Sequence, residues 1–314
     1  MSEANTARRR AYGDKDDNWF GNGTEWGLPF LRQHFPSISE RVAAGIWRGS
    51  QSLGADDELS SDHGWGAAFG LVLTELDFQS TAEHLEQALQ KSAPAEWKGF
   101  SRPPDYEITV TSIDRFFQDW VGFSTPPQDS SQWLEGFHFR FGTRETELYM
   151  IRHGHIFYDP LGEFTARRDL FVKYPRDIRL RRINQELLNV WHYGQYNFVD
   201  RLSKRNDSVA NCMALGHFTE GVMRLCMLLD DDYTVYWKWL AFEFRKHSVA
   251  QFLDPLLKTL TTNTDVSQQV DLVNEICEFL HTLLQTHQLA ASDISFHPHS
   301  LFCDLLKGPL AEYA

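Results

Sequence analysis

The sequence is poor in cysteine, with four among 314 residues. Cys212, Cys226, Cys277 and Cys303 lie in apolar, helix-like sequence and form no CxxC pair. Neither a disulfide framework nor a cysteine-based metal or redox site is therefore predicted. Because buried free thiols are typical of a reducing compartment, we expect a cytoplasmic protein.

Long apolar runs are also missing. No uninterrupted apolar stretch approaches the roughly 18 residues of a membrane-spanning helix, so we expect no membrane association. The N-terminus carries Arg8, Arg9 and Arg10 without an apolar segment behind them, which argues against a secretory signal. Residues 1–18 are expected to form a flexible polar tail.

Positive charge is scarce, because 30 lysines and arginines face 43 aspartates and glutamates, a net charge of −13. Such a chain repels phosphate backbones, so broad nucleic-acid binding is not expected, although a local basic patch could still bind a nucleotide. Aromatic residues, in contrast, make up 14% of the chain, which excludes disorder for its bulk. The length allows two ordinary domains.

The chain changes character between its two halves. Residues 19–170 mix strand-like and helical patterns, whereas residues 171–314 are helical by periodicity, so an α/β domain is expected before an all-helical one. The first domain is expected to contain a helix from Ser37 or Ser39 to Ile46, helices at 81–92 and 113–120, and strands at 69–76, 106–111, 148–151 and 155–158. The second is expected to contain helices at 177–194, 208–230, 233–247, 249–260 and 266–289.

The most informative stretch begins at Gly49-Ser50 and continues through an acidic loop to the string SSDHGWG at residues 60–66. Glycine allows a phosphate to approach the backbone, and loop amides with a serine hydroxyl can hold its oxygens. Carboxylates beyond the loop can bind Mg²⁺. An exposed acidic turn is the alternative. Trp47 and Trp65 bracket the loop and are expected to pack, with base stacking as their alternative role.

This string resembles the nucleotide-binding signature of the polymerase-beta-like nucleotidyltransferase superfamily, which runs Gly-Ser, a variable loop and then Ser-Asp-x-Asp. It is most similar to an uncharacterised bacterial and fungal family of that superfamily with an Asp-His-x-Trp-Gly signature, here at residues 62–66. Three later strings, Tyr158–Glu163, Tyr174–Asp177 and Tyr233–Leu240, support it together. The resemblance covers residues 47–247 and implies an α+β fold, in which a nucleotidyltransferase-like mixed-sheet domain precedes an all-helical one.

One position departs from the superfamily pattern. The second carboxylate should follow Asp62 by two residues, but Gly64 stands there and has no ligand atom to offer. A third carboxylate normally comes from a neighbouring strand, for which Glu107 is the candidate, and Thr109 shares its strand face. The resemblance thus implies a weak magnesium site of Asp62 and Glu107. Side chains that could compensate are those of Asp57, Glu58 and His63.

Five further positions each have a functional and a structural interpretation. His63 is either a general acid or base or a histidine that bonds the loop backbone. Arg48 faces an anionic ligand or lies on the surface. Asp159 is a turn carboxylate that the resemblance makes a substrate-binding candidate. By the same resemblance Tyr236 and Lys238 reach the nucleotide, whereas the structural alternative for Lys238 is a snorkelling lysine on a core helix.

These features predict an enzyme that transfers a nucleoside monophosphate from a nucleoside triphosphate to a small-molecule acceptor, in a cleft between the two domains. Gly49 and Ser50 would hold the triphosphate, and Asp62, His63 and Glu107 would be catalytic. Gly64 leaves two alternatives open, a related scaffold with other small-molecule biosynthetic chemistry and a non-catalytic protein. The acceptor and the oligomeric state are not predicted.

Overall fold

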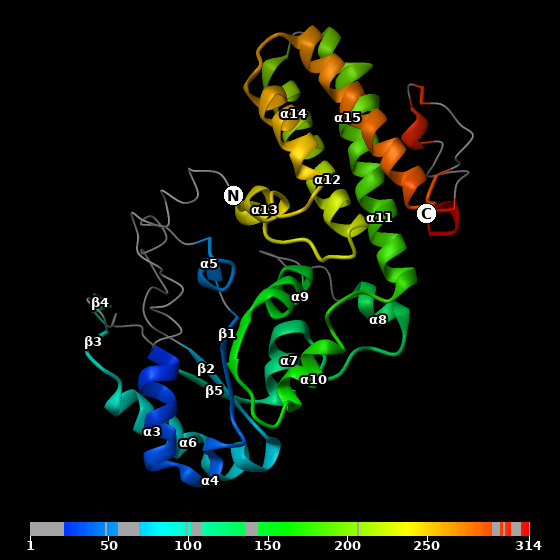
Figure 1. Cartoon of the computed structure of the whole chain (residues 1–314). Helices are drawn as coiled ribbons and strands as arrows, with labels where there is room; N and C mark the ends of the chain where they lie inside the picture. Colours follow the sequence, from blue (N-terminus) through cyan, green and yellow to red (C-terminus); the bar gives the residue numbers. More distant parts are fainter. Residues whose placement is uncertain are drawn as a thin grey trace. The chain divides into compact units, whose positions relative to one another are not determined.

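The computed structural model describes residues 22–47, 49–55, 69–97, 100–101, 108–135, 144–205, 207–290, 296–297, 299–302 and 309–313. These residues form two compact units (Figure 1). Unit 1 contains the described residues up to Pro127 together with Glu147–Val172, and unit 2 contains those of Gln128–Thr146 and of Lys173–Ala314. The domain boundary predicted from the sequence lies at residue 170, with 128–146 in the first domain. In the structure, the described residues of 128–146 belong to unit 2.

Unit 1 is built on a four-stranded mixed sheet with the strand order β5-β2-β1-β6. β1 (Ala43–Ile46) pairs antiparallel with both β2 (Gly70–Leu73) and β6 (His155–Tyr158). β2 pairs parallel with β5 (Thr109–Ser112). A separate antiparallel ladder joins β3 (Glu96–Trp97) to β4 (Phe100–Ser101). The mixed sheet confirms the predicted α+β class.

β1 corrects the prediction of a helix running from Ser37 or Ser39 to Ile46. The helix there, α4 (Pro36–Ser39), is one turn long, and all four residues of β1 are buried between two neighbouring strands. Alanine favours helices in isolation, but the pairing and burial of a central strand outweigh that preference. β5 likewise begins three residues later than the predicted strand at 106–111.

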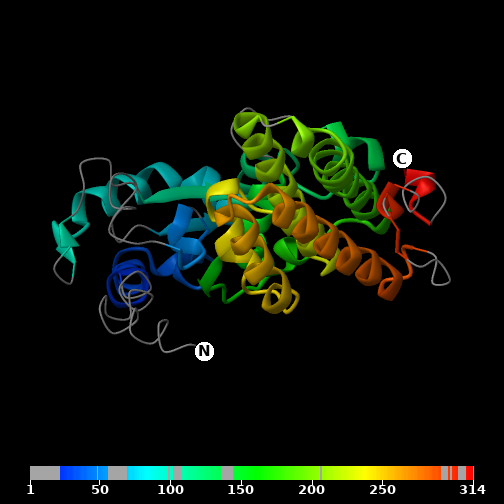
Figure 2. The same ribbon diagram turned by 90° about the horizontal axis from the view of Figure 1, so that it is seen from above.

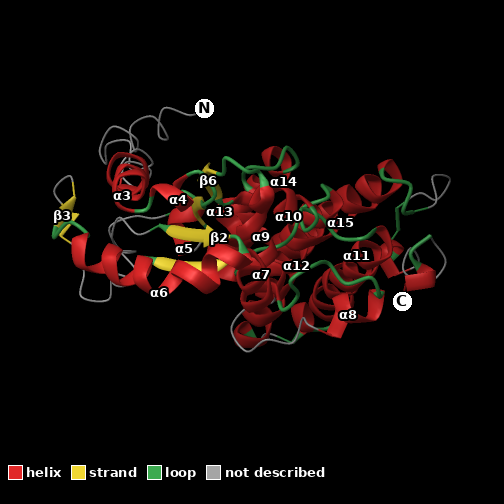
Figure 3. Cartoon of the chain, turned by 90° about the horizontal axis from the view of Figure 1, so that it is seen from below, coloured by secondary structure: helices red, strands yellow, loops and turns green. Residues whose placement is uncertain are grey.

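Successive residues of β1 and β2 face opposite sides of the sheet. Ala44, Ile46, Leu71 and Leu73 belong to a core cluster with residues of α3 (Leu28–His34), α4 and α6 (Glu75–Ser92). On the other side, α7 (Ile113–Val121) and α10 (Glu163–Asp169) supply an aromatic cluster. The sheet is therefore covered on both faces, and strands form a small part of a mostly helical chain (Figure 3).

Trp47 belongs to that aromatic cluster, with its ring centroid 4.9 Å from Phe116 and 5.1 Å from Phe164. Glycines make room for the indole: a Cβ added at Gly45 would lie 2.3 Å from Trp47 Cζ3, and one added at Gly70 would lie 2.6 Å from Trp47 Cζ2. At Gly154 it would lie 2.9 Å from Trp47 Cβ. Trp47 thus packs, as expected, and anchors the end of β1.

Helix α6 begins at Glu75, six residues before the start of the predicted helix at 81–92. Thr74 is the N-cap and accepts from the backbone N–H of Asp77, while the Thr74 hydroxyl donates to the Asp77 carboxylate at 2.9 Å. Ser80 instead donates to Leu76 O at 3.0 Å, as a serine inside a helix does. The Arg41 guanidinium, which donates to Asp77, lowers the pKa of that carboxyl.

The segment Leu148–Ile151, predicted as a strand, lies inside helix α9 (Arg144–His153). All four residues are buried, and a short apolar run has the same appearance in a buried strand and in a buried helix. β6 begins two residues after α9 ends, as predicted from His155. His153 and His155 therefore do not share one strand.

Unit 2 is helical, as predicted for the C-terminal part. It contains α8 (Ser130–Glu135), α11 (Arg176–Trp191), α12 (Ser208–Leu229), α13 (Trp237–Phe244), α14 (Ala250–Thr262) and α15 (Val266–Thr286). A π-helical turn, η3 (His192–Val199), continues α11. Figures 1 and 2 show α11, α12, α14 and α15 side by side. The shorter elements of the chain are η1 (Asn22–Gly27), α5 (Gly49–Ser52), η4 (Leu202–Lys204) and η5 (Ala311–Tyr313).

Helix α12 is, by length and composition, the one helix among the described residues that could cross a membrane. Its residues Phe218, Val222 and Leu225 are fully buried, and it packs against α11 and α14. Such burial is what the core helix of a soluble protein shows.

Replacement of Gly45 by alanine is expected to lower the free energy of unfolding by about 1–3 kcal/mol, because the new methyl group would overlap Trp47 and the backbone oxygen of His155. Gly216, inside α12, is the matched control, since no atom lies within 4 Å of an added Cβ. Gly216→Ala is expected to raise that free energy by about 0.5–1 kcal/mol. Urea unfolding of both variants measures the difference, and equal effects would contradict the described packing around Trp47.

Candidate functional site

Four chain segments meet at one edge of the sheet. β1 ends there at Ile46, which pairs with His155, the first residue of β6. Its neighbour β2 begins there, because Gly70 pairs with Gly45. β5 also begins there, because Thr109 pairs with Gly70 in the parallel ladder. We call this the β1-end edge, and it lies wholly within unit 1.

The chain leaves the β1-end edge through the Gly49-Ser50 pair. Gly49 is exposed and has φ +67°, and among the described residues no heavy atom beyond its chain neighbours lies within 4 Å of a Cβ added there. It opens α5, where the Ser52 hydroxyl donates to Gly49 O at 2.9 Å. A positive φ favours glycine, and the open space allows a ligand to approach the backbone closely. This is the feature that a phosphate-binding turn requires.

Asp159 lies away from this turn. It follows Tyr158, which ends β6 and pairs with Ala44 at the other end of β1. Four strand residues span about 10 Å, so β6 separates Asp159 from the β1-end edge. Its carboxylate accepts from the backbone N–H of Thr165 at 2.8 Å, in the first turn of α10. In the structure Asp159 is therefore a turn carboxylate, which is the structural interpretation that its sequence context gave.

Tyr236 and Lys238 lie at the start of α13 in unit 2. The Tyr236 ring lies 5.4 Å from that of Trp237 and 5.8 Å from that of Trp239, and Lys238 is exposed. The site residues Arg48, Asp62, His63 and Glu107 lie outside the described residues, as does the side chain of Ser50. Within the described part of the chain, no group of three or more His, Cys, Asp or Glu residues could hold a metal ion.

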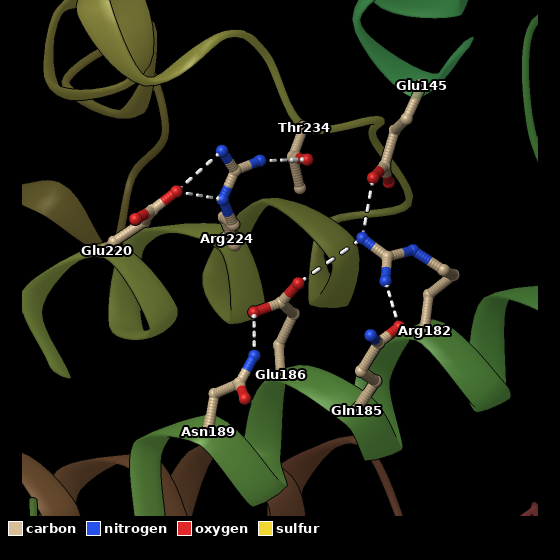
Figure 4. A network of polar contacts seen from close by, with 8 residues as sticks. All are labelled: Glu145, Arg182, Gln185, Glu186, Asn189, Glu220, Arg224 and Thr234. Carbon is tan, nitrogen blue, oxygen red and sulfur yellow. Dashed lines mark hydrogen bonds and ion pairs between the residues drawn. The ribbon is translucent and has the colours of Figure 1, made fainter. Parts of the chain in front are cut away.

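A buried network of charged side chains lies inside unit 2 (Figure 4). Arg182 Nη2, on α11, donates to Glu145 Oε2 at 2.7 Å and to Glu186 Oε1 at 3.2 Å. The side chains of these three residues are 10%, 0% and 7% exposed, respectively. Asn189 donates to the second Glu186 oxygen at 3.1 Å. The guanidinium group of Arg182 therefore binds two buried carboxyl groups.

The burial of this network shifts its protonation. Burial raises the pKa of Glu186, even though Arg182 opposes the shift. Burial alone would lower the pKa of Arg182, but Glu145, Tyr174 and Glu186 raise it, and the net direction is upward. Arg182 thus keeps its charge and pairs with the fully buried Glu145 carboxyl group.

Two more arginines fix the chain between α12 and α13. Arg224 Nη1 donates to the Thr234 hydroxyl at 2.6 Å, and its Nε and Nη2 donate to Glu220 Oε1 at 2.9 and 2.8 Å. Arg179 donates to the carbonyl oxygens of Leu228 and Leu229 at the end of α12, at 2.8 and 3.0 Å. Cationic groups stabilise helix C-termini in this way. Arg179 and Arg224 therefore fix the segment between α12 and α13, which leads to Tyr236.

The sequence analysis did not find this network, because the arginines at 176–182 have the pattern of a solvated helix face. The spacing of residues in the sequence nevertheless indicated that Arg182 and Glu186 are buried. Ile178, Arg182 and Glu186 follow one another at four-residue spacing, and the first of them is apolar and fully buried. Charged residues in register with an apolar stripe indicate a buried ion pair.

One part of the chain matches the model of a known protein family. The model of DUF4037, a domain of unknown function, matches residues 141–240, which include the later strings at 158–163, 174–177 and 233–240. A crystal structure of a nucleotidyltransferase-like protein from Exiguobacterium sibiricum 255-15 is similar, at 14% identity and a TM-score of 0.36, over 90% of this chain and 79% of that one. None of the curated proteins matches. Residues 141–240 of this chain are thus similar to the DUF4037 family.

Proposed function

We propose that the chain transfers a nucleoside monophosphate from a nucleoside triphosphate to a hydroxyl or amine of a small molecule. One observation carries the proposal: the open Gly49 turn lies at the sheet edge where β2 and β5 begin. The segments that lead into these two strands carry the acidic candidates. Asp62 precedes Gly70 by eight residues, and Glu107 precedes Ile108 directly.

In the proposed reaction, the acceptor oxygen or nitrogen forms a bond to the α-phosphorus while the bond from that phosphorus to the β-phosphate bridging oxygen breaks. Pyrophosphate leaves, and the acceptor proton passes to Glu107 or His63 as general base. Arg48, Gly49 and Ser50 hold the triphosphate. Asp159 is not included, because its carboxylate is engaged in the turn before α10.

Magnesium fits this proposal only through residues outside the described part of the chain. The described residues of the β1-end edge offer no carboxylate, so a metal would depend on Asp62 and Glu107. Bound there, it would neutralise phosphate charge. Nucleotide binding with and without a chelator tests for the metal.

Thermal denaturation with ATP, GTP, CTP or UTP, each with MgCl₂ or with EDTA, tests the proposal. Binding at 100 times Kd is expected to stabilise the fold by about 2.7 kcal/mol. Gly64→Asp restores the second carboxylate of the signature, and we expect it to tighten magnesium-dependent binding about tenfold or more. Gly66→Asp adds a carboxylate outside the Ser-Asp-x-Asp pattern; it is the matched control and should not tighten binding.

Three other outcomes of these measurements would contradict the proposed function or favour one of its alternatives. If none of the four triphosphates stabilises either form, nucleotidyl transfer is wrong. If the wild type binds and Gly64→Asp binds less tightly, Gly64 provides close backbone approach for a substrate and the related scaffold with other chemistry is favoured. Binding of a triphosphate without pyrophosphate release from it, whichever acceptor is supplied, favours a non-catalytic protein.

A further inference from the structure

His155 is the residue that the topology brings to the β1-end edge in place of Asp159. Because β6 is antiparallel to β1, its first residue rather than its last lies beside the end of β1. His155 pairs with Ile46, and the Gly49 turn starts three residues after Ile46. An imidazole therefore lies at the edge through which the chain enters the Gly49 turn.

The pairing also sets the face on which His155 lies. Residues directly opposite in an antiparallel pair place their side chains on the same face of the sheet. Ile46 is buried in the core cluster of α3, α4 and α6, whereas His155 is exposed. His155 thus lies on the face of that cluster but beyond the part that the helices cover.

Among the four strand-end residues of this edge, His155 carries the one ionisable side chain, since the others are Ile46, Gly70 and Thr109. Trp47, next to Ile46, is buried in the aromatic cluster. Gly49 offers its backbone alone. Of these four strand-end residues, His155 is therefore the one whose side chain could offer a charged hydrogen-bond donor to a phosphate at this turn.

We propose that His155 binds phosphate oxygens of the nucleotide held at the Gly49 turn, and this inference rests on the proposed function. An imidazole N–H donates to anionic oxygens, and such charge-assisted hydrogen bonds are shorter and stronger than neutral ones. In a chain of net charge −13, a polyphosphate needs donors close to it. The assigned ligand class is a polyphosphate group, independent of the base attached to it.

Isothermal titration with ATP and with inorganic triphosphate tests this assignment. His155→Ala is expected to raise the Kd of both ligands about tenfold or more, by the same factor, because the lost hydrogen bond is to the phosphates. His155→Gln keeps an N–H donor and should recover part of the affinity. His153→Ala is the matched control, an exposed histidine two residues earlier on α9, and should change both values less than twofold.

The outcomes separate this inference from the proposed function. Wild type that binds ATP, with His155→Ala unchanged within twofold, overturns the role of His155 and leaves the proposed function standing. A loss for ATP but not for inorganic triphosphate also overturns it. Wild type that binds neither ligand overturns both. If His155→Ala lowers the melting temperature of the protein without ligand, the His155→Gln variant decides. A His155→Gln variant with native stability and weakened binding of both ligands supports the contact. A His155→Gln variant with native affinity for both ligands overturns it.

Discussion

Asp62→Ala is expected to abolish magnesium-dependent nucleotide transfer, with a loss of about a thousandfold or more. Asp62 is the retained carboxylate of the Ser-Asp-x-Asp pattern, and Gly64 leaves no second carboxylate in that pair to replace it. A metal contact contributes several kcal/mol of charge stabilisation, and about 4 kcal/mol corresponds to a thousandfold in rate. Pyrophosphate release from the triphosphate that binds wild type measures the loss.

The same variant separates function from folding. We expect its free energy of unfolding to stay within about 1 kcal/mol of wild type, as for a surface substitution. Glu86→Ala, at an exposed position of α6, is the control and should leave both quantities unchanged. Full activity of purified Asp62→Ala would contradict the assignment of this residue.

Arg182→Met is expected to lower the free energy of unfolding by about 3–5 kcal/mol. Methionine keeps much of the aliphatic stem but leaves Glu145 buried without its cation, and an uncompensated buried charge costs about that much. Arg182 also opposes the upward pKa shift of Glu186, so its removal raises that pKa further. Since a raised carboxyl pKa costs stability as the pH rises, the loss should be larger at pH 8 than at pH 5.

Two comparisons make this result specific. Arg245 pairs with Asp254 at 3.0 Å with its side chain 46% exposed, and Arg245→Met should cost less than about 1 kcal/mol. Glu145→Leu combined with Arg182→Met removes both charges of the buried pair and should recover much of the loss. Equal costs for the two single arginine variants would refute the buried network.

The helices of the C-terminal part were predictable because each carries its own periodic signal. Five predicted ranges, from 177–194 to 266–289, coincide with α11 to α15 within a few residues at most ends. The errors lie where tertiary contacts decide. Ala43–Ile46 is a strand because two other strands enclose it, and one of these, β6, lies more than 100 residues away.

The candidate site was predictable in part for the same reason. The Gly-Ser turn follows from local sequence, and Gly49 has a positive φ there. Which end of β6 meets the turn depends on strand direction, and a motif does not encode direction. The resemblance made Asp159 a candidate, and the strand pairing places His155 beside the end of β1. Arg182 was missed because it lies among arginines that have the pattern of a solvated face, although its four-residue spacing from the buried Ile178 indicated burial.

The pairing of Ile46 with His155 has a consequence for synthesis, because these residues are 109 positions apart. At about 5–20 residues per second, roughly 5–20 s pass between translation of β1 and translation of β6. During that interval β1 and β2 can pair, but the other side of β1 has no partner. An unpaired strand edge promotes association with other chains. The growing chain thus passes through a period in which the β6 side of β1 is unpaired and aggregation-prone, and pairing with β6 ends that period.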